Sequence, residues 1–175
     1  MNIADFKIYH SQIIPDVCLF ETCKFMDTRG SLYTTFYKDI MENFLPKGLY
    51  FKHDKFTTSF HNVLRGIHGD SKSWKLVTSV YGEVVEVFVD LRPDSPTYKK
   101  WDKIVINQDN QISVLLPPGV GNSFYVTSEI AVYHYKLAYD GEYFDALDQF
   151  TVKWNDPELG IAWPSTTPLL SDRDK

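Results

Sequence analysis

Cysteine is scarce in this chain of 175 residues, which contains only Cys18 and Cys23. Two cysteines are too few for a disulfide framework, and their spacing fits neither a zinc site nor a redox motif. Their scarcity excludes the class of small secreted domains that disulfides hold together. We therefore expect reduced thiols and a cytoplasmic protein.

Long hydrophobic runs and a surplus of basic residues are lacking as well. No apolar segment approaches the ~18 residues that a membrane-spanning helix needs. Residues 1–7 have no basic start followed by an apolar run, so no signal peptide is predicted. Lys and Arg number 18 against 23 Asp and Glu, a formal net charge of −5. This balance argues against a nucleic-acid partner, and any phosphate group must be held by a few placed arginines.

Aromatic and β-branched residues are abundant. Hydrophobic residues make up 43% of the chain and aromatic residues 15%, which is enough for a sizeable core, and the length fits one domain, residues 1–175. Short apolar runs bounded by turn residues are typical of strands, and three of them are Val84–Val89, Ile104–Ile106 and Ile112–Leu116. Their spacing predicts an all-β sandwich or barrel.

Two local patterns refine this prediction. Helical periodicity is convincing only near Asp39–Leu45, where Asp39 is expected to cap a short helix that Pro46 stops. A further strand is predicted over Ala131–Lys136. Because side chains alternate between the faces of a strand, Tyr133 and Tyr135 share one face. Two such tyrosines suit the lining of a barrel interior, but the pattern alone favours ordinary core packing.

Two segments do not fit a plain core. The first, residues 62–70, carries Arg65 and His68 shortly before Lys75, and the second, residues 115–124, is a proline-glycine turn that leads into a strand. Together they resemble the two-motif layout of the cupin barrel. A metal-binding cupin has clustered histidines and a glutamate in the first motif and a further histidine in the second. Here Asp70 and Asn122 stand where two of those histidines would fall. No bound metal is therefore expected.

Further short motifs lie before and after these two segments. With the first motif, they resemble the dTDP-4-dehydrorhamnose 3,5-epimerase family of metal-free cupins from about Asp27 to Asp174. The motifs that carry the resemblance are residues 27–30, 63–68, 75–77, 82–84, 89–92, 95–97, 117–119, 135–136, 154–157, 160–164 and 170–174. The resemblance implies a cupin or jelly-roll barrel with a few short helices.

The reaction of this family inverts carbons 3 and 5 of a nucleotide-linked 4-keto-6-deoxy sugar. The ketone at carbon 4 acidifies both neighbouring C–H bonds, so the resemblance implies no cofactor. It implies a base on one face of the sugar, an acid on the other, and a group that stabilises the enolate oxygen.

The resemblance also assigns these tasks to residues. His68 matches the base and Asp174 the carboxylate that pairs with it. Tyr135 matches the acid, with Tyr133 as the alternative if the strand register is off by two, and Lys75 matches the lysine near the oxygen on carbon 4. Asp174 lies in a polar tail, and the ends of chains tend to fray. Its pairing with His68 therefore predicts that the C-terminal tail docks against the barrel.

Substrate-binding residues follow from the same resemblance. Arg29 and Arg65 match arginines that hold the diphosphate. His53, Lys55 and Asn122 occupy substrate-binding positions but differ from the family's usual residues.

Departures of this kind indicate a changed nucleotide or sugar on retained chemistry. A GDP-linked 4-keto-6-deoxy-heptose of capsule synthesis fits them, and a dTDP-hexose with repositioned contacts is the close alternative. Tyr139, Tyr143 or Trp74 then supplies a replacement stacking surface for the base, unless these side chains are ordinary packing.

Other functions stay open from the sequence. An epimerase that inverts carbon 3 alone is the nearest alternative, and a non-catalytic cupin that binds a sugar nucleotide is a different class. Family members are commonly dimers whose N-terminal strands cross between subunits, so a homodimer is expected.

Overall fold

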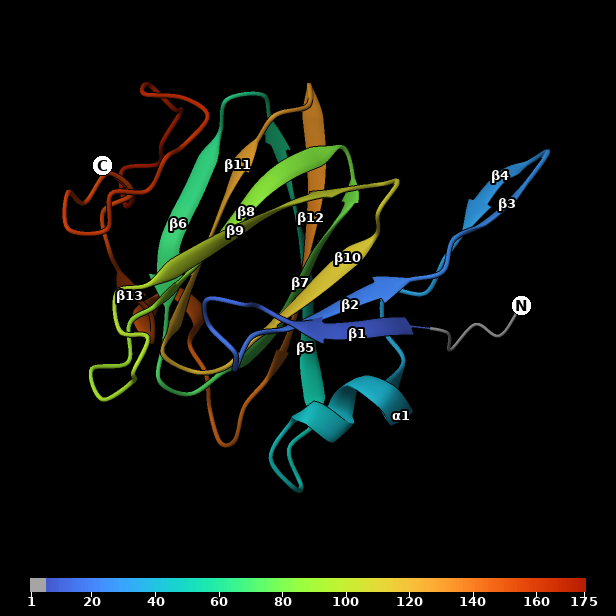
Figure 1. Cartoon of the computed structure of the whole chain (residues 1–175), viewed down its shortest axis with the longest axis horizontal. Helices are drawn as coiled ribbons and strands as arrows, with labels where there is room; N and C mark the ends of the chain where they lie inside the picture. The colour runs from blue at the N-terminus through green and yellow to red at the C-terminus, as the bar shows by residue number, and fades with distance from the viewer. Residues whose placement is uncertain (1–5) are drawn as a thin grey trace.

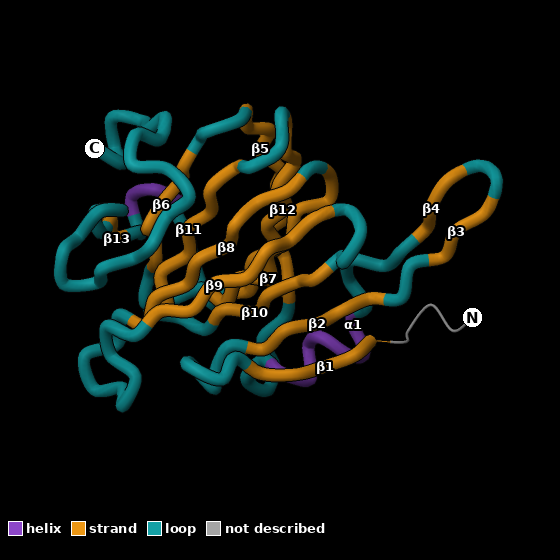
Figure 2. Tube along the Cα trace, turned by 45° about the horizontal axis from the view of Figure 1, so that its top comes forward, coloured by secondary structure: helices purple, strands orange, loops and turns teal. Residues whose placement is uncertain are grey.

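The computed structural model describes residues 6–175, and within them the chain is built on two facing antiparallel β-sheets (Figures 1 and 2). The six-stranded sheet has the order β1 (Phe6–His10), β2 (Cys18–Thr22), β10 (Ile112–Leu116), β7 (Trp74–Tyr81), β12 (Ile130–Ala138) and β5 (Phe51–Phe60). The five-stranded sheet has the order β13 (Phe150–Thr151), β6 (Leu64–Gly69), β11 (Val120–Val126), β8 (Glu83–Asp90) and β9 (Trp101–Asn107). The prediction of an all-β jelly-roll barrel is confirmed.

The predicted strands coincide with strands of the barrel. Ile112–Leu116 is β10 itself, while Val84–Val89 and Ile104–Ile106 lie within β8 and β9. β10 pairs with β2 on one side and β7 on the other, and all five of its side chains are buried. A run of apolar residues without alternation therefore marks a strand covered on both faces.

The main apolar core lies between the two sheets. It combines Val77 and Val114 of the six-stranded sheet with Val84, Phe88 and Phe124 of the five-stranded sheet. Burial of these side chains is the principal stabilising contribution to the barrel.

One short helix covers the outer face of the six-stranded sheet. α1 (Lys38–Met41) continues into the 3-10 turn η1 (Glu42–Phe44), and the backbone becomes extended at Leu45, so the predicted end before Pro46 is confirmed. The predicted cap at Asp39 is wrong, because the N-cap is Tyr37 and Asp39 lies in the first turn. Tyr37 makes no side-chain cap bond, and the helix is anchored to the sheet by Met41, which is buried in one cluster with Phe20 and Leu115.

A hairpin of β3 (Phe25–Asp27) and β4 (Gly30–Leu32) projects away from both sheets (Figure 1). Its apolar side chains are open to solvent: Phe25 is 43% exposed, Met26 62% and Leu32 67%. Such a surface on a projecting element is unusual unless another molecule covers it.

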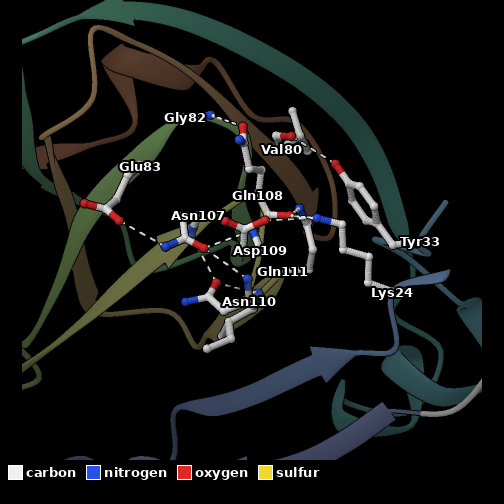
Figure 3. Close-up of polar contacts among 11 residues, drawn as sticks. Lys24, Tyr33, Val80, Gly82, Glu83, Asn107, Gln108, Asp109, Asn110 and Gln111 are labelled. Atoms are coloured by element: carbon white, nitrogen blue, oxygen red, sulfur yellow. Dashed lines mark hydrogen bonds and ion pairs between the residues drawn. The ribbon is translucent and has the colours of Figure 1, made fainter. Parts of the chain in front are cut away.

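Both ends of this hairpin are tied to the barrel (Figure 3). Just before β3, the Lys24 Nζ donates to the Gln108 carbonyl at 2.8 Å and pairs with Asp109 at 3.1 Å. Just after β4, the Tyr33 hydroxyl donates to the Val80 carbonyl at 2.9 Å. The hairpin thus leaves the barrel from two fixed points.

The turn that receives Lys24 is itself ordered by side chains. The Asn107 Oδ1 accepts the backbone N–H groups of Asp109 and Asn110, both at 3.0 Å, and the Asn107 Nδ2 donates to Glu83 at 3.0 Å (Figure 3). An asparagine that bonds the backbone of its own turn in this way is typical of turns, and it orders the connection between β9 and β10.

Two expectations concern membranes. Among residues 6–175, no helix combines the length and the apolar character needed to cross a bilayer. The prediction that no signal peptide is present rests on residues 1–7, of which residues 1–5 lie outside the described part of the chain.

Candidate active site

A pocket collects side chains from both sheets, from the 3-10 turn η2 (Asp145–Leu147) and from the C-terminal segment. Seven of the nine predicted site residues line it: Lys55, Arg65, His68, Lys75, Asn122, Tyr135 and Asp174. Its charged lining also includes Arg173 and Asp145. The pocket therefore joins residues that lie up to 119 positions apart in the sequence, from Lys55 to Asp174.

His68 and Asp174 form a hydrogen-bonded pair at one wall. The His68 Nε2 lies 2.6 Å from the Asp174 Oδ1, and the Ser171 hydroxyl donates to the other carboxylate oxygen at 2.7 Å. The carboxylate is nearly buried, at 3% exposure, whereas the imidazole is 21% exposed. With Nε2 engaged by Asp174, Nδ1 is the ring nitrogen left to accept a proton.

The environment keeps Asp174 ionised. Burial alone would raise the pKa of its carboxyl group, but the hydrogen bonds from His68 and Ser171 outweigh burial and hold the pKa below its usual range. An ionised partner stabilises the imidazolium that forms when His68 takes up a proton.

The C-terminal tail docks against the barrel, as predicted. The backbone of Leu169 exchanges hydrogen bonds with the backbone groups of Asn62 (2.7 Å) and Leu64 (3.0 Å) beside β6. These bonds hold the tail along the strand that carries His68, and Asp174 is 4% exposed. The tail thus forms part of the pocket wall.

An irregularity in β6 brings Arg65 and His68 into the same pocket. The two residues are three positions apart, so regular alternation would direct them to opposite faces. Between them the pairing with β11 shifts: Asn122 lies opposite His68 and Phe124 lies opposite Arg65. Three steps on β6 thus match two on β11, and this β-bulge re-aims the side chains.

Gly66 makes the bulge possible. Its φ is +117°, and a Cβ there would lie 2.6 Å from the Asn122 carbonyl oxygen. Only glycine fits this conformation and this close approach.

Tyr135 and Lys75 line the wall formed by the six-stranded sheet. Tyr135 on β12 lies opposite Lys55 of β5 and Val77 of β7, and Lys75 lies opposite Leu137, so these side chains share one face of the sheet. His68, in contrast, belongs to the five-stranded sheet. The imidazole and the phenol therefore enter the pocket from different sheets.

The Tyr135 hydroxyl makes no hydrogen bond within residues 6–175. Burial, with a further contribution from the nearby Glu86, raises the pKa of this phenol above its ordinary value. The group therefore keeps its proton at neutral pH and is free to donate it to a ligand.

Tyr133, the alternative acid, occupies a different place. It is fully buried in the core, stacks on Phe124 at 4.1 Å between ring centroids, and donates to the buried Glu86 carboxyl at 2.6 Å. The predicted common face of Tyr133 and Tyr135 is confirmed: one tyrosine packs in the core, and the other lines the pocket.

Lys75 is paired inside the pocket. Its Nζ lies 3.2 Å from the Asp70 Oδ2, and the side chains are 5% and 0% exposed. Burial lowers the pKa of the Lys75 ammonium, while Asp70 acts in the opposite direction.

The remaining predicted ligands that line the pocket have partners on the protein. Lys55 pairs with Asp145 of η2, with Nζ–O distances of 2.7 and 2.8 Å. Arg65 donates from Nε to the Ser59 hydroxyl at 2.9 Å. Asn122, the cross-strand neighbour of His68, lies 3.3 Å from the Tyr133 hydroxyl.

Two predicted site residues lie elsewhere. Arg29 is at the tip of the β3–β4 hairpin, where it pairs with Asp27 and its side chain is 87% exposed. His53 is on β5, two residues before Lys55, but it contacts Tyr139, with ring centroids 6.3 Å apart, and does not line the pocket. Within residues 6–175 of a single chain, Arg29 and His53 therefore do not line the pocket.

Several pocket residues were not predicted. Asp145, Gln149, Ser171 and Arg173 line the pocket, and the Arg173 guanidinium is held by Gln149 (3.1 Å) and Thr151. Asp145 and Gln149 lie in a polar loop that gives no signal for a site. Ser171 and Arg173 lie in the motif of residues 170–174, from which only Asp174 was predicted as a site residue.

The aromatic residues considered for stacking have other surroundings. Trp74 packs on the cluster under α1, Tyr139 contacts Tyr143, and the Tyr143 hydroxyl donates to Asp70 at 3.1 Å. Within the described residues, none of the three lines the pocket.

Metal-ligating side chains are not clustered in the described part of the chain. Within residues 6–175, no three His, Cys, Asp or Glu side chains gather as a metal site would require. The cross-strand neighbour of His68 is an amide, Asn122, which binds metals more weakly than imidazole does.

Comparison with known proteins gives a coherent result. A family model described as dTDP-4-dehydrorhamnose 3,5-epimerase matches residues 11–175. A dTDP-4-dehydrorhamnose 3,5-epimerase of Pseudomonas aeruginosa is 36% identical over 165 residues, which cover 93% of this chain and 90% of the relative. A dTDP-4-dehydrorhamnose 3-epimerase of Streptomyces niveus is 35% identical over 155 residues, 85% of this chain and 72% of the relative.

Solved structures agree in fold. The crystal structure of a dTDP-6-deoxy-D-glucose-3,5-epimerase from Legionella pneumophila, in complex with dTDP-4-keto-L-rhamnose, superposes with a TM-score of 0.87. The two proteins are 32% identical, and the match covers 97% of this chain and 90% of the other.

Proposed function

The chain belongs to the dTDP-4-dehydrorhamnose 3,5-epimerase family, and from this we propose that it inverts carbons 3 and 5 of a nucleoside-diphosphate-linked 4-keto-6-deoxy sugar. Inversion requires that a proton leaves one face of the sugar carbon and that another arrives at the opposite face. The observation that carries the proposal is the pocket itself, in which the His68–Asp174 pair and the Tyr135 hydroxyl come from different sheets.

In the proposed reaction His68 removes the proton. Its Nδ1 takes the proton from the carbon next to the ketone, and the positive charge that forms on the ring is balanced by Asp174, 2.6 Å from Nε2. The ionised state of Asp174 supports this role.

Tyr135 returns a proton from the other side. Its hydroxyl is protonated and has no protein acceptor among the described residues, so it is available to the enolate carbon. Lys75 lies diagonally across from it on the neighbouring strand, and its ammonium would stabilise the negative charge that develops on the oxygen at carbon 4.

The diphosphate is assigned to cations at the same pocket. Arg65 uses only its Nε on Ser59, and among residues 6–175 its terminal nitrogens have no hydrogen-bond partner. Lys55 and Arg173 add charge, and Asn122 adds an amide donor beside His68. Planar guanidinium groups bind phosphate oxygens in pairs.

The proposed contact of Arg29 with a diphosphate requires a second copy of the chain. Arg29 is carried by a hairpin that projects from the barrel, is anchored at Lys24 and Tyr33, and exposes apolar side chains. We assign the protein to a homodimer in which each hairpin lies on the partner, so that Arg29 reaches the partner's diphosphate.

The substrate class rests on the relatives. The Legionella structure holds a dTDP-linked hexose, which makes a dTDP-hexose the first candidate. A GDP-linked heptose is the second, because His53, Lys55 and Asn122 depart from the usual family residues. The unpaired thiols of Cys18 and Cys23 support a cytoplasmic location. We further propose that the product enters capsule or surface polysaccharide synthesis.

Proton NMR in D₂O tests the proposal, with dTDP- and GDP-linked 4-keto-6-deoxy sugars offered separately. Deuterium at carbons 3 and 5 is the expected result, and the nucleotide that exchanges faster identifies the substrate. Exchange with neither substrate, in protein shown to be folded, contradicts the proposal and supports a non-catalytic cupin that binds sugar nucleotides.

Inversion at carbon 3 alone is the second candidate. It is favoured by one observation, the similarity to a Streptomyces relative that is named a 3-epimerase. Deuterium at carbon 3 without deuterium at carbon 5 would establish it.

A further inference from the structure

Asp70 lies at the end of β6, where the chain turns toward β7, and its carboxylate is held from several sides. The Oδ1 accepts the backbone N–H groups of Lys72 at 2.9 Å and Ser73 at 2.5 Å. The Oδ2 accepts the Ser73 hydroxyl at 2.7 Å and the Tyr143 hydroxyl at 3.1 Å. These four hydrogen bonds therefore hold the Asp70 carboxylate in one orientation.

The same carboxylate contacts Lys75. The Nζ–Oδ2 distance is 3.2 Å, and both side chains are almost completely buried. Burial would raise the pKa of Asp70, but Lys75 and the hydrogen bonds from Ser73 lower it below its usual range. The pair therefore consists of an ionised carboxylate and an ammonium group.

Other charged groups around Lys75 act in both directions. Lys55 on β5 disfavours a second positive charge, while Asp145 of η2 favours one, and these two are paired with each other. Tyr135 on β12 and His68 on β6 share the pocket with Lys75. Within residues 6–175, Asp70 is the only residue that forms an ion pair with Lys75.

We propose that Asp70 is a positioning residue for Lys75, which holds the ammonium at the pocket wall and in its charged form. This inference rests on the proposed epimerase function, in which Lys75 stabilises the enolate oxygen. A buried lysine without a partner loses its proton readily, and a neutral amine stabilises an enolate poorly.

The proposal gives the loop between β6 and β7 a task. The chain turns within residues 70–73, and the turn places Asp70 five residues before Lys75. The ion pair therefore links this turn to the start of β7, where Lys75 lies.

The test is the pH profile of kcat/KM for the wild type, D70N and D70E, with S73A as the matched control. D70N keeps the size and an oxygen acceptor for the turn but removes the charge. S73A removes one hydrogen bond to the same carboxylate and leaves the charge in place.

We expect D70N to lower kcat/KM at neutral pH by roughly ten- to hundred-fold. The basic limb of its profile should move to lower pH by about one unit or more, so that acidification restores part of the activity. D70E should recover most of the wild-type limb, and S73A should keep it. A purely structural role predicts equal losses in D70N and S73A with unmoved limbs, and that result overturns the proposal.

A second measurement keeps the inference testable apart from catalysis. The lysine side chains are labelled with ¹³C, and the Lys75 signal is identified by its loss in K75M. Its titration midpoint should lie lower in D70N than in the wild type. Equal midpoints overturn the role of Asp70, whereas absent deuterium exchange in the wild type overturns the epimerase function.

Discussion

His68 is the residue whose loss should affect the proposed chemistry most. We expect H68N to reduce kcat by roughly 10²–10⁴-fold, because asparagine keeps a polar side chain but does not take up a proton. Binding of the sugar nucleotide, measured by calorimetry, should change only a few-fold. Turnover within a few-fold of the wild type would show that another group is the base.

The chain offers a matched control for this substitution. His134 also pairs with an aspartate, Asp54. It lies on the face of β12 opposite to that of Tyr135, and it stacks on the exposed ring of Phe56. H134N should therefore leave turnover within a few-fold of the wild type. Losses of equal size in both variants would point to a general effect of removing a His–Asp pair.

Tyr135 permits a different kind of test, because removal and return of the proton are separate steps. In Y135F, proton removal by His68 should continue, so the ratio of deuterium exchange to inverted product should rise by about ten-fold or more. NMR in D₂O measures both quantities in one sample. Y133F, on the same strand face but in the core, should change stability and leave this ratio as in the wild type.

The sequence predicts these residues unevenly. His68, Lys75 and Tyr135 lie in motifs of fixed spacing on strands, so their place in the pocket follows from register and resemblance. Asp70 was noted only as standing where a metal-binding cupin has a histidine. Its pairing with Lys75 was not predicted, because the two meet through a turn whose shape depends on Ser73 and Tyr143. Pairings made by loops leave no periodic signal.

Among the elements, β6 depends most on one irregularity. We expect G66A to lower the free energy of unfolding by about 3 kcal/mol, because alanine is strained at φ +117° and its Cβ meets the Asn122 carbonyl. This corresponds to a fall in Tm of roughly 6–12 °C. The kcat/KM of the folded variant should fall as well, since this bulge orients Arg65 and His68.

G141A is the control for G66A. Gly141 also has a positive φ, +66°, but a Cβ added there would meet no atom within 4 Å. The substitution should cost only about 1 kcal/mol and leave kcat/KM unchanged. If G66A melts like G141A, β6 tolerates a regular strand and the bulge is not required.

The elements also show what a pattern of residues determines. β8, β9 and β10 were predicted because apolar runs bounded by turn residues are local signals. The bulge in β6 was not, since regular alternation predicts opposite faces for Arg65 and His68. The start of α1 was missed because the burial of Met41 outweighs a weak cap, and such burial depends on chain segments far away in the sequence.

At the scale of the whole molecule, the proposed dimer makes each pocket a product of two chains. R29A and H68N should each be poorly active as pure dimers. When they are unfolded together and refolded, half of the dimers are mixed, and one pocket in each mixed dimer has both Arg29 and His68. Activity should therefore return to about a quarter of the wild-type value.

The control is each variant refolded alone, with the dimer fraction measured by light scattering. Activity of the mixture equal to the mean of the two pure samples would show that Arg29 and His68 act within one chain, or that Arg29 takes no part. A monomer in light scattering would contradict the dimer directly.

The pairing of His68 with Asp174 spans 106 positions of the chain. The tail that carries Asp174 has no surface to dock on until β6 is paired within its sheet, because its backbone bonds are made beside that strand. We therefore expect docking to be a late event in folding, so that the His68–Asp174 pair forms only after the sheet that carries β6. Circular dichroism during refolding should recover before turnover does, so catalytic activity is a stricter measure of native structure here than sheet content.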